Sequence, residues 1–237
     1  MSWRILACDY DGTLAHHGVL SDATAVALDQ FRAAGGRLLM VTGRELPDLQ
    51  SVCSALDKFE WIVAENGALL YRPADGFDQL LCSAASAELA RELADAGAQP
   101  LSVGRAIIAT REPYEAVAIK LIKELGLELQ IIFNKGAVMI LPSGVNKSTG
   151  LEAALERMKV AAKDVVAVGD AENDHALLAK CGIGVAVSNA VASLKEQADF
   201  VTKAARGEGV AELIDRLVAD KLTGIFRRED QKPHKQQ

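Results

Sequence analysis

Two carboxylates separated by one residue, Asp9 and Asp11, directly follow a short apolar run and precede Gly12. In open α/β sheets, active sites form beyond the carboxyl ends of the strands, which is the position expected for this pair. A carboxylate at such a strand end can act as a nucleophile, and a second one nearby can act as a general acid and base. Taken alone, an ordinary Asp-Gly turn is the simpler interpretation, so the catalytic one depends on what else converges there.

Two further groups of polar residues lie where a predicted strand ends or a predicted helix begins. Thr42, Gly43 and Arg44 follow the apolar run at residues 37–41, and a hydroxyl with backbone N–H groups there can hold phosphate oxygens. Thr42 could instead serve only as a helix cap. Lys147 begins a predicted helix, where a cation opposes the helix dipole, although a surface lysine is the simpler interpretation of it alone.

An acidic cluster follows the apolar run at residues 165–168 and contains Asp170, Glu172, Asn173 and Asp174. So many carboxylates at a buried sheet edge are costly unless a cation neutralises them. Oxygen ligands from carboxylates and a backbone carbonyl favour a hard, octahedral cation, and the sequence therefore predicts Mg²⁺. With Asp9, the set suits a phosphoryl group, because the cation can neutralise charge while Lys147 and Thr42 bind the remaining oxygens.

Apolar runs alternate with amphipathic stretches on both sides of one interruption, a pattern typical of βα units around a parallel sheet. We therefore predict an α/β protein with a doubly wound, Rossmann-like parallel sheet as its core and a small inserted α+β cap domain. The Asn66-Gly67 pair predicts a hairpin after the third strand. The predicted core strands are residues 3–8, 37–41, 61–64, 165–168, 183–187 and 200–201, with helices at 21–34, 46–56, 146–158, 172–180, near 192 and at 210–219.

We place the core at residues 1–74 and 144–222, the inserted cap at 75–143, and a polar, disordered tail at 223–237. The cap differs from the core because its pattern is not a continuation of the βα alternation. Its predicted elements are helices at 86–96 and 113–125 and strands at 106–110, 127–133 and 137–141.

Four segments in order, DYDGTL, TGR, the lysine of NKSTGL and GDAEND, resemble the motifs of the haloacid dehalogenase (HAD) superfamily of phosphohydrolases. The resemblance extends over residues 1 to about 220. It implies a phosphoaspartyl intermediate on a nucleophilic aspartate, with a second aspartate as acid and base. The residues so implied are Asp9 as nucleophile, Asp11 as acid and base, Thr42 and Lys147 on the phosphate, and Mg²⁺ held by Asp9, the Asp11 carbonyl and Asp170, supported by Asp174 with Asn173 beside it.

The position of the insertion, between Thr42 and Lys147, is similar to that of the second cap type (C2) in this superfamily. Such caps occur in Cof-like phosphatases, sucrose-phosphate phosphatases and archaeal-type phosphoglycolate phosphatases. Because a cap rooted there closes over Asp9, we expect a small phosphorylated metabolite as substrate, a phosphosugar or a phospho-acid. Asn66 is a candidate for substrate contact, although a plain turn explains it equally well. Arg105, Arg111 and Lys135 are candidates for a second anionic group, although scattered surface charge is the simpler interpretation of each.

The composition narrows the class of protein. The chain has 237 residues, 50% of them hydrophobic, and a formal net charge of −6, which argues against nucleic-acid or anionic-membrane binding. No apolar run reaches the roughly 18 residues that span a bilayer, and the four cysteines are far apart, so we expect a soluble cytoplasmic protein. The sequence gives no sign of its oligomeric state.

The sequence therefore predicts a Mg²⁺-dependent phosphatase. A phosphomutase of the same superfamily remains an alternative, because it shares the chemistry and returns the phosphoryl group to the substrate. A phospho-accepting regulatory domain of receiver type is a second alternative. Receivers are far smaller, however, and lack both a cap and a carboxylate in the place of Asp11.

Overall fold

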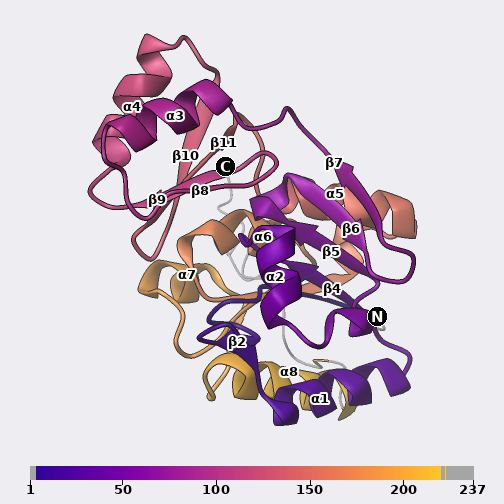
Figure 1. The fold of residues 1–237 in the computed structure, drawn as a ribbon. Coiled ribbons are helices and arrows are strands. Elements are labelled where there is room, and N and C mark those ends of the chain that lie inside the picture. Colours follow the sequence, from indigo (N-terminus) through magenta and orange to yellow (C-terminus); the bar gives the residue numbers. More distant parts are fainter. Residues whose placement is uncertain (1–3, 220–221, 223–237) are drawn as a thin grey trace, which may run out of the picture.

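An eight-stranded sheet forms the centre of the larger part of the protein (Figure 1). The structure is a computed structural model and describes residues 4–219 and 222. The strands of this sheet are β1 (Ile5–Cys8), β4 (Arg37–Val41), β5 (Trp61–Ala64), β6 (Leu69–Arg72), β7 (Phe77–Leu80), β12 (Val165–Gly169), β13 (Ile183–Ala186) and β14 (Phe200–Val201). They lie in the order β14-β13-β12-β1-β4-β5-β6-β7. Strands β14 to β5 run parallel, while β6 and β7 are antiparallel additions at one edge.

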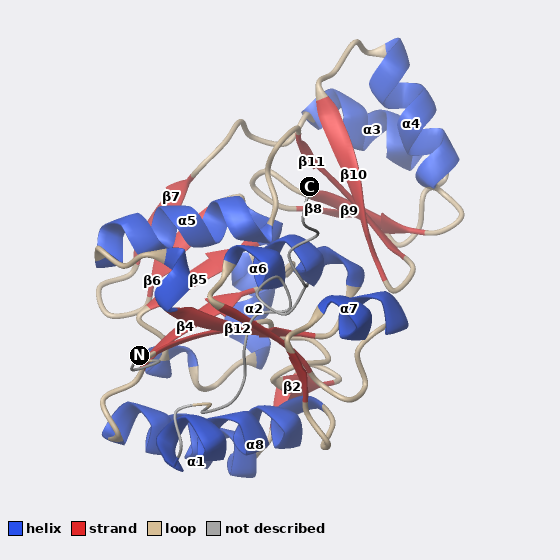
Figure 2. Ribbon diagram, turned by 180° about the vertical axis from the view of Figure 1, so that it is seen from behind, coloured by secondary structure: helices blue, strands red, loops and turns tan. Residues whose placement is uncertain are grey.

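Helices cover both faces of this sheet, so the expected doubly wound core is confirmed (Figure 2). The helices are α1 (Asp22–Ala33), α2 (Leu46–Val52), α5 (Lys147–Met158), α6 (His175–Lys180), α7 (Ala192–Gln197) and α8 (Arg206–Ala219). Alternation along β1 explains the two layers, because successive side chains of a strand point to opposite faces. Leu6 and Cys8 pack with α1 and α8, whereas Ile5 and Ala7 pack with α5 and α6. A parallel strand buried on both faces needs an almost wholly apolar sequence, and β1 has one.

The inserted cap is a four-stranded antiparallel sheet with two helices on one face (Figure 1). It contains α3 (Ala87–Asp95), α4 (Glu115–Glu124), β8 (Ser102–Val103), β9 (Ile108–Arg111), β10 (Leu129–Asn134) and β11 (Ala137–Pro142), with strand order β10-β11-β9-β8. Ile140 of β11 packs under α3 and α4. Its neighbours Met139 and Leu141 face the other way and pack with Ala68 of the core. The cap sheet therefore presents its helix-free face to the core.

The structure departs from the sequence-based expectation at several places. We expected the cap to begin at residue 75, but β7 (Phe77–Leu80) pairs with β6 and belongs to the core sheet, so the chain leaves that sheet after Leu80. The Asp75-Gly76 pair, with Gly76 at φ +70°, makes the hairpin that adds this strand. The helix expected over residues 46–56 ends at Val52, and the short hairpin of β2 (Ala15–His16) and β3 (Val19–Leu20) was not expected.

The remaining elements are short 3₁₀ helices: η1 (Leu56–Lys58), η2 (Glu65–Gly67), η3 (Ala162–Asp164) and η4 (Glu172–Asp174). The expected disordered tail at 223–237 and the first residue of the strand expected at 3–8, Trp3, lie outside the described residues. Among residues 4–219 and 222, no helix has both the length and the apolar character required to cross a membrane.

Packing between α1 and α8 supports the face of the sheet that carries Leu6 and Cys8, and it gives a direct test of the core. Leu28 of α1 is fully buried in this layer with Leu213 of α8, while Val26 of α1 is 55% exposed. We expect Leu28→Ala to lower the free energy of unfolding by about 2–5 kcal/mol in urea denaturation, because it leaves a cavity. The control Val26→Ala should change it by no more than about 0.5 kcal/mol. Equal losses in the two variants would contradict this packing.

Candidate active site

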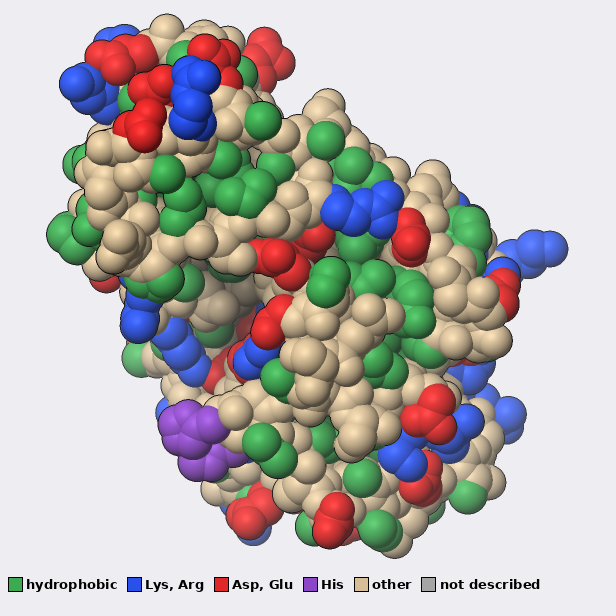
Figure 3. Space-filling view, in the orientation of Figure 1, with side chains coloured by type: hydrophobic (Ala, Val, Ile, Leu, Met, Phe, Trp, Pro, Cys, Tyr) green, Lys and Arg blue, Asp and Glu red, His purple; other side chains and the backbone are tan. Residues whose placement is uncertain are grey.

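The carboxyl ends of four parallel strands meet at the edge of the core sheet that faces the cap. Asp9 follows β1, Thr42 follows β4, Glu65 follows β5 and Asp170 follows β12, and all four side chains are buried. Figure 3 shows the surface hollowed between the cap and the core, with acidic and basic side chains gathered in the hollow. The site therefore lies where open α/β sheets place their ligands.

Asp9 keeps the strand geometry of β1, which determines where its side chain points. Its backbone N–H donates to the Val168 carbonyl at 3.0 Å, so the ladder between β1 and β12 continues through Asp9. Cys8 packs into the layer of α1 and α8, and Asp9 therefore points to the opposite side. Burial raises the pKa of the Cys8 thiol, which favours an unreactive core role for Cys8.

Lys147 is the buried cation around which the site is organised. Its Nζ donates to Asp9 Oδ1 at 2.5 Å and to Asp174 Oδ1 at 2.6 Å, and its side chain is 1% exposed. Burial alone lowers the pKa of Lys147, but Asp174 and Asp9 outweigh that effect and hold this pKa above its ordinary value. Lys147 stays charged and fixes Asp9. It begins α5, whose first N–H groups are capped by Asn146.

Asp9, Asp170 and Asp174 bring carboxylate oxygens within 4.8 Å of one another, all of them buried. Burial raises the pKa of Asp9; Lys147 opposes the rise, and Asp174 and Asp170 add to it. Burial likewise raises the pKa of Asp170. Three carboxylates around one buried ammonium leave negative charge uncompensated in a site that excludes water. This donor set fits a hard divalent cation such as Mg²⁺.

Asp174 also orders the loop that carries Asp170. Its Oδ2 accepts the backbone N–H groups of Asp170 at 2.9 Å and Ala171 at 3.0 Å. Asp174 thus uses one oxygen for the loop and the other for Lys147. Three donors therefore hold its carboxylate, the Lys147 ammonium and the N–H groups of Asp170 and Ala171, and Asp174 in turn keeps Lys147 and the Asp170 loop in place.

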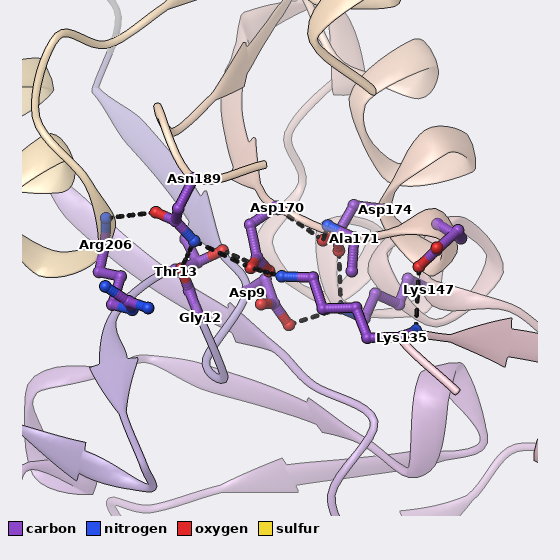
Figure 4. Close-up of polar contacts among 11 residues, drawn as sticks. Asp9, Gly12, Thr13, Lys135, Lys147, Asp170, Ala171, Asp174, Asn189 and Arg206 are labelled. Carbon is purple, nitrogen blue, oxygen red and sulfur yellow. Dashed lines mark hydrogen bonds and ion pairs between the residues drawn. The ribbon is translucent and has the colours of Figure 1, made fainter. Parts of the chain in front are cut away.

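Asp170 is held from three sides (Figure 4). Thr13 Oγ1 donates to its Oδ1 at 3.3 Å, and Asn189 Nδ2 donates to its Oδ2 at 3.2 Å. The ammonium of Lys135, at the tip of the β10–β11 hairpin of the cap, also donates to Oδ2. The backbone N–H of Lys135 donates to Glu172 Oε2 at 3.1 Å, which fixes the hairpin tip against η4. A cap residue therefore offsets part of the negative charge of the core site.

Gly12 is required by this close approach. Its φ is +83°, and a Cβ placed there would lie 2.2 Å from Asp170 Oδ2. Asn189 Nδ2 donates to the Gly12 carbonyl at 2.8 Å as well as to Asp170, so Asn189 bridges the turn after Asp9 and the acidic loop. Only glycine meets both conditions, a left-handed backbone and no side chain.

Asp11 lies outside the buried carboxylate cluster, with 40% of its side chain exposed. The phosphate contact expected at Arg44 was through its backbone N–H group; its guanidinium donates to Asp11 at 2.6 and 2.7 Å and to Asp48 at 2.6 Å. The fork geometry of arginine suits this bidentate pairing and fixes the Asp11 carboxylate. The expected metal contact of Asp11 was through its backbone carbonyl and does not involve this side chain.

Thr42, in the loop after β4, does not act as a helix cap. Thr42 Oγ1 accepts the backbone N–H of Arg44 at 3.1 Å, whereas α2 has Glu45 at its N-cap position. Thr42 is therefore not the cap of α2. Its hydroxyl shapes the tight loop at Gly43, next to Asn173.

Asn66 and Asn173, both expected near the substrate, contact each other. Asn173 Nδ2 donates to Asn66 Oδ1 at 3.0 Å. The remaining Asn66 Nδ2 and Asn173 Oδ1 are buried and have no hydrogen-bond partner among the described residues. Buried polar atoms are rarely left without a partner, so this pair offers a donor and an acceptor to a ligand in the hollow.

Other expected residues lie apart from this cluster. The guanidinium of Arg105 pairs with Asp78 of β7, and Arg111 is exposed at the end of β9. Lys135 proved to be part of the site, although surface charge was the simpler interpretation. Thr13 and Asn189 were missed, and for Asn189 a signal was present, because it follows β13 just as the other site residues follow their strands.

Comparison with known proteins shows the family to which the chain belongs. The model of the haloacid dehalogenase-like hydrolase family matches residues 6–100 and 97–214. The chain is 33% identical to phosphoglycolate phosphatase 2 of Saccharolobus solfataricus over 95% of each chain. It is 32% identical to a phosphoglycolate phosphatase of Methanothermobacter thermautotrophicus, over 91% of this chain and 99% of that one. A solved HAD subclass IIB sugar phosphatase superposes with a TM-score of 0.72 at 18% identity, covering 90% of this chain and 98% of that one.

The chain therefore belongs to the haloacid dehalogenase-like hydrolase family. This confirms the family and the hydrolase class expected from the four motifs. The likeness to the solved phosphatase extends over the cap as well as the core and confirms the fold class.

The buried carboxylates predict how stability depends on pH when no metal is bound. Asp9 and Asp170 have pKa values raised above the ordinary 3.8. Between 3.8 and the raised values the folded chain binds more protons than the unfolded chain, so the free energy of unfolding falls as pH rises. In EDTA, we expect the wild type to be more stable at about pH 5 than at about pH 7, and Asp170→Asn to reduce that difference.

Magnesium provides the control for the same measurement. Millimolar Mg²⁺ should raise the melting temperature of the wild type near neutral pH and raise that of Asp170→Asn less, because only a folded site binds the ion. Groups elsewhere titrate alike in both proteins and cancel in the comparison. A pH dependence that is the same in both, with no effect of Mg²⁺, would contradict a charged, metal-binding cluster.

Proposed function

We propose that this protein is a Mg²⁺-dependent phosphatase that hydrolyses a small phosphorylated metabolite through a phosphoaspartyl intermediate on Asp9. The observation that carries the proposal is the buried pairing of Asp9 with Lys147, with Asp170 and Asp174 beside it, beneath a cap. A carboxylate with one oxygen held by an ammonium has its other oxygen available for attack on phosphorus.

The residues suggest a two-step reaction. In the first step Asp9 Oδ2 forms a bond to phosphorus, the bond from phosphorus to the ester oxygen breaks, and the leaving oxygen takes a proton from Asp11. In the second step Asp11 removes a proton from water, whose oxygen attacks phosphorus and releases Asp9 and inorganic phosphate. The Asp11 side chain is part exposed, and Arg44 fixes the orientation of its carboxylate. Lys147 and the N–H groups of the loop at Gly43 stabilise the charge on the phosphoryl oxygens.

Mg²⁺ would be held by Asp9 and Asp170, with Asp174 supporting the site. When bound, the ion neutralises charge between the carboxylates and the phosphate, which allows an anionic nucleophile to approach an anionic substrate. The chain's own residues then orient the phosphoryl group.

The substrate we favour is a short phosphorylated carboxylic acid, with phosphoglycolate as the first candidate. Two relatives at 33% and 32% identity, aligned over nearly their whole length, have the name phosphoglycolate phosphatase. Lys135 brings a positive charge from the cap to the edge of the site, where it can pair with a second anionic group. A cap that closes over the site leaves room for a compact ligand and excludes a folded protein surface.

Replacing the nucleophile tests the reaction. Asp9→Asn keeps the shape of the side chain, but an amide does not attack phosphorus, so kcat should fall by about 10⁴-fold or more. Phosphate release from phosphoglycolate, several phosphosugars and p-nitrophenyl phosphate, with Mg²⁺, measures this. The control Asp57→Asn, at an exposed position of η1, should keep wild-type rates. Wild-type turnover in pure Asp9→Asn protein would exclude Asp9 as the nucleophile.

Replacing the cap lysine tests the substrate class. Lys135→Met should raise KM for phosphoglycolate by about tenfold or more, because a charge-assisted contact to its carboxylate is lost. KM for p-nitrophenyl phosphate, which has no second anionic group, should change less. Lys120→Met, on the exposed side of α4 in the same cap, is the matched control and should change neither value. If the two substrates respond equally to Lys135→Met, the lysine does not recognise a carboxylate.

A further inference from the structure

Glu65 is a buried carboxylate that belongs to the core but binds the cap. It follows β5, and its side chain is 1% exposed. Its Oε1 accepts the backbone N–H of Arg105 at 3.0 Å, and its Oε2 accepts those of Ala106 at 2.7 Å and Ile107 at 3.1 Å. These three N–H groups belong to residues 104–107, which form the turn between β8 and β9 and are named the cap turn here.

The cap turn fits closely around this carboxylate. A Cβ placed at Gly104 would lie 2.8 Å from both Cδ and Oε2 of Glu65, so the absence of a side chain at Gly104 is needed for the contact. Consecutive N–H groups that converge on one anion form a concave anion site of the kind known as a nest. In this protein the nest is on the cap, and its anion is supplied by the core.

The backbone at Glu65 and Asn66 is hydrogen-bonded to the loop at residues 42–44. Its N–H donates to the Arg44 carbonyl at 2.9 Å, and the N–H of Asn66 donates to the Thr42 carbonyl at 2.9 Å. Glu65 and Asn66 both have positive φ, +48° and +55°, which non-glycine residues rarely adopt without a local reason. Arg44 in turn holds Asp11 through two hydrogen bonds. A continuous set of contacts therefore runs from the cap turn through Glu65 and Arg44 to Asp11.

We propose that Glu65 is a positioning residue that docks the cap turn onto the loop at residues 42–44 and thereby couples cap closure to the orientation of Asp11. The docking depends only on the contacts above, whereas the consequence for proton transfer rests on the function proposed for Asp11. The contact is suited to opening and closing, because the carboxylate and the three N–H groups are each hydrated when apart and each satisfied when together. An apolar contact of the same size would instead resist opening, since it would expose hydrophobic surface.

The first experiment removes the charge and keeps the shape. Glu65→Gln retains one acceptor oxygen and places an NH₂ group opposite backbone N–H donors. In hydrogen exchange of the full-length protein followed by mass spectrometry, the peptide that contains the cap turn should exchange about tenfold faster or more in Glu65→Gln. Peptides from α4 and α8 should exchange as in the wild type. Gly104→Ala, which keeps Glu65 but crowds the same contact, should give the same pattern.

The matched control is Glu45→Gln. Ser102 Oγ of the cap donates to Glu45 Oε1, so this glutamate also joins core to cap, but at the exposed rim of the interface. Glu45→Gln should leave exchange of the cap turn within about twofold of the wild type, because exposed contacts contribute little.

Activity then tests the coupling to Asp11. An ester with a poor leaving group needs a proton from Asp11, whereas p-nitrophenyl phosphate has an activated leaving group and needs it less. Glu65→Gln should therefore lower kcat for phosphoglycolate by about tenfold and lower kcat for p-nitrophenyl phosphate by less than about threefold. A role confined to folding would lower both alike.

Each outcome decides a separate point. Unchanged exchange of the cap turn in both Glu65→Gln and Gly104→Ala would overturn the docking, and faster exchange throughout α4 and α8 would show that Glu65 only stabilises the fold. Faster exchange of the cap turn with equal loss for both substrates would overturn the coupling. If the wild type hydrolyses no phosphate ester, the function proposed above fails, while the exchange data still decide the docking.

Discussion

The interaction on which the site depends is the burial of the Lys147 ammonium between Asp9 and Asp174. Breaking such a pair inside a protein is costly, because the remaining charges would stay buried without a partner. The arrangement therefore fixes three elements relative to one another: the end of β1, the start of α5 and the loop after β12. It also leaves more negative than positive charge at the sheet edge, since Asp170 lies within the same cluster. The cap, which packs against this edge, contacts it with positively charged and N–H donor groups.

The cap meets buried carboxylates of the core with two different kinds of donor. At the tip of the β10–β11 hairpin, the ammonium of Lys135 contacts Asp170, so a cation of the cap meets an anion of the core. At the turn between β8 and β9, backbone N–H groups of the cap surround Glu65. In both contacts the core supplies the carboxylate. Docking of the cap is thus electrostatically matched to the acidic edge of the sheet, and the apolar contact of Met139 and Leu141 with Ala68 adds to it.

The sequence predicted best what depends on local pattern. Strands β4 and β5 have the bounds expected from their apolar runs, and Asp9, Thr42 and Asp170 follow strands as expected. The pairing of Arg44 with Asp11 could not be predicted in this way, because 33 residues separate the two and the contact depends on how the strands pack. The position of Lys135 was equally inaccessible. Its hairpin is visible in the sequence, but the orientation of the cap that brings its tip to Asp170 is not encoded in any residue spacing.

The two cap–core contacts, at Glu65 and at Lys135, also differ in whether they depend on what is bound in the site. The Glu65 contact uses only protein atoms and can form whether or not the hollow is filled. The Lys135 contact involves Asp170, which is also a candidate metal ligand. The Lys135 ammonium and a divalent cation would therefore compete for the same carboxylate. Because like charges repel at short range, a divalent cation held by Asp170 would weaken the contact of Lys135 with this carboxylate and leave its ammonium free to pair with another anion. A substrate that carries a second anionic group next to its phosphate supplies that anion, whereas a neutral leaving group does not. In the closed arrangement the Glu65 contact can therefore persist while Lys135 changes partner, so the proposed closure of the cap and the proposed discrimination among substrates depend on different contacts.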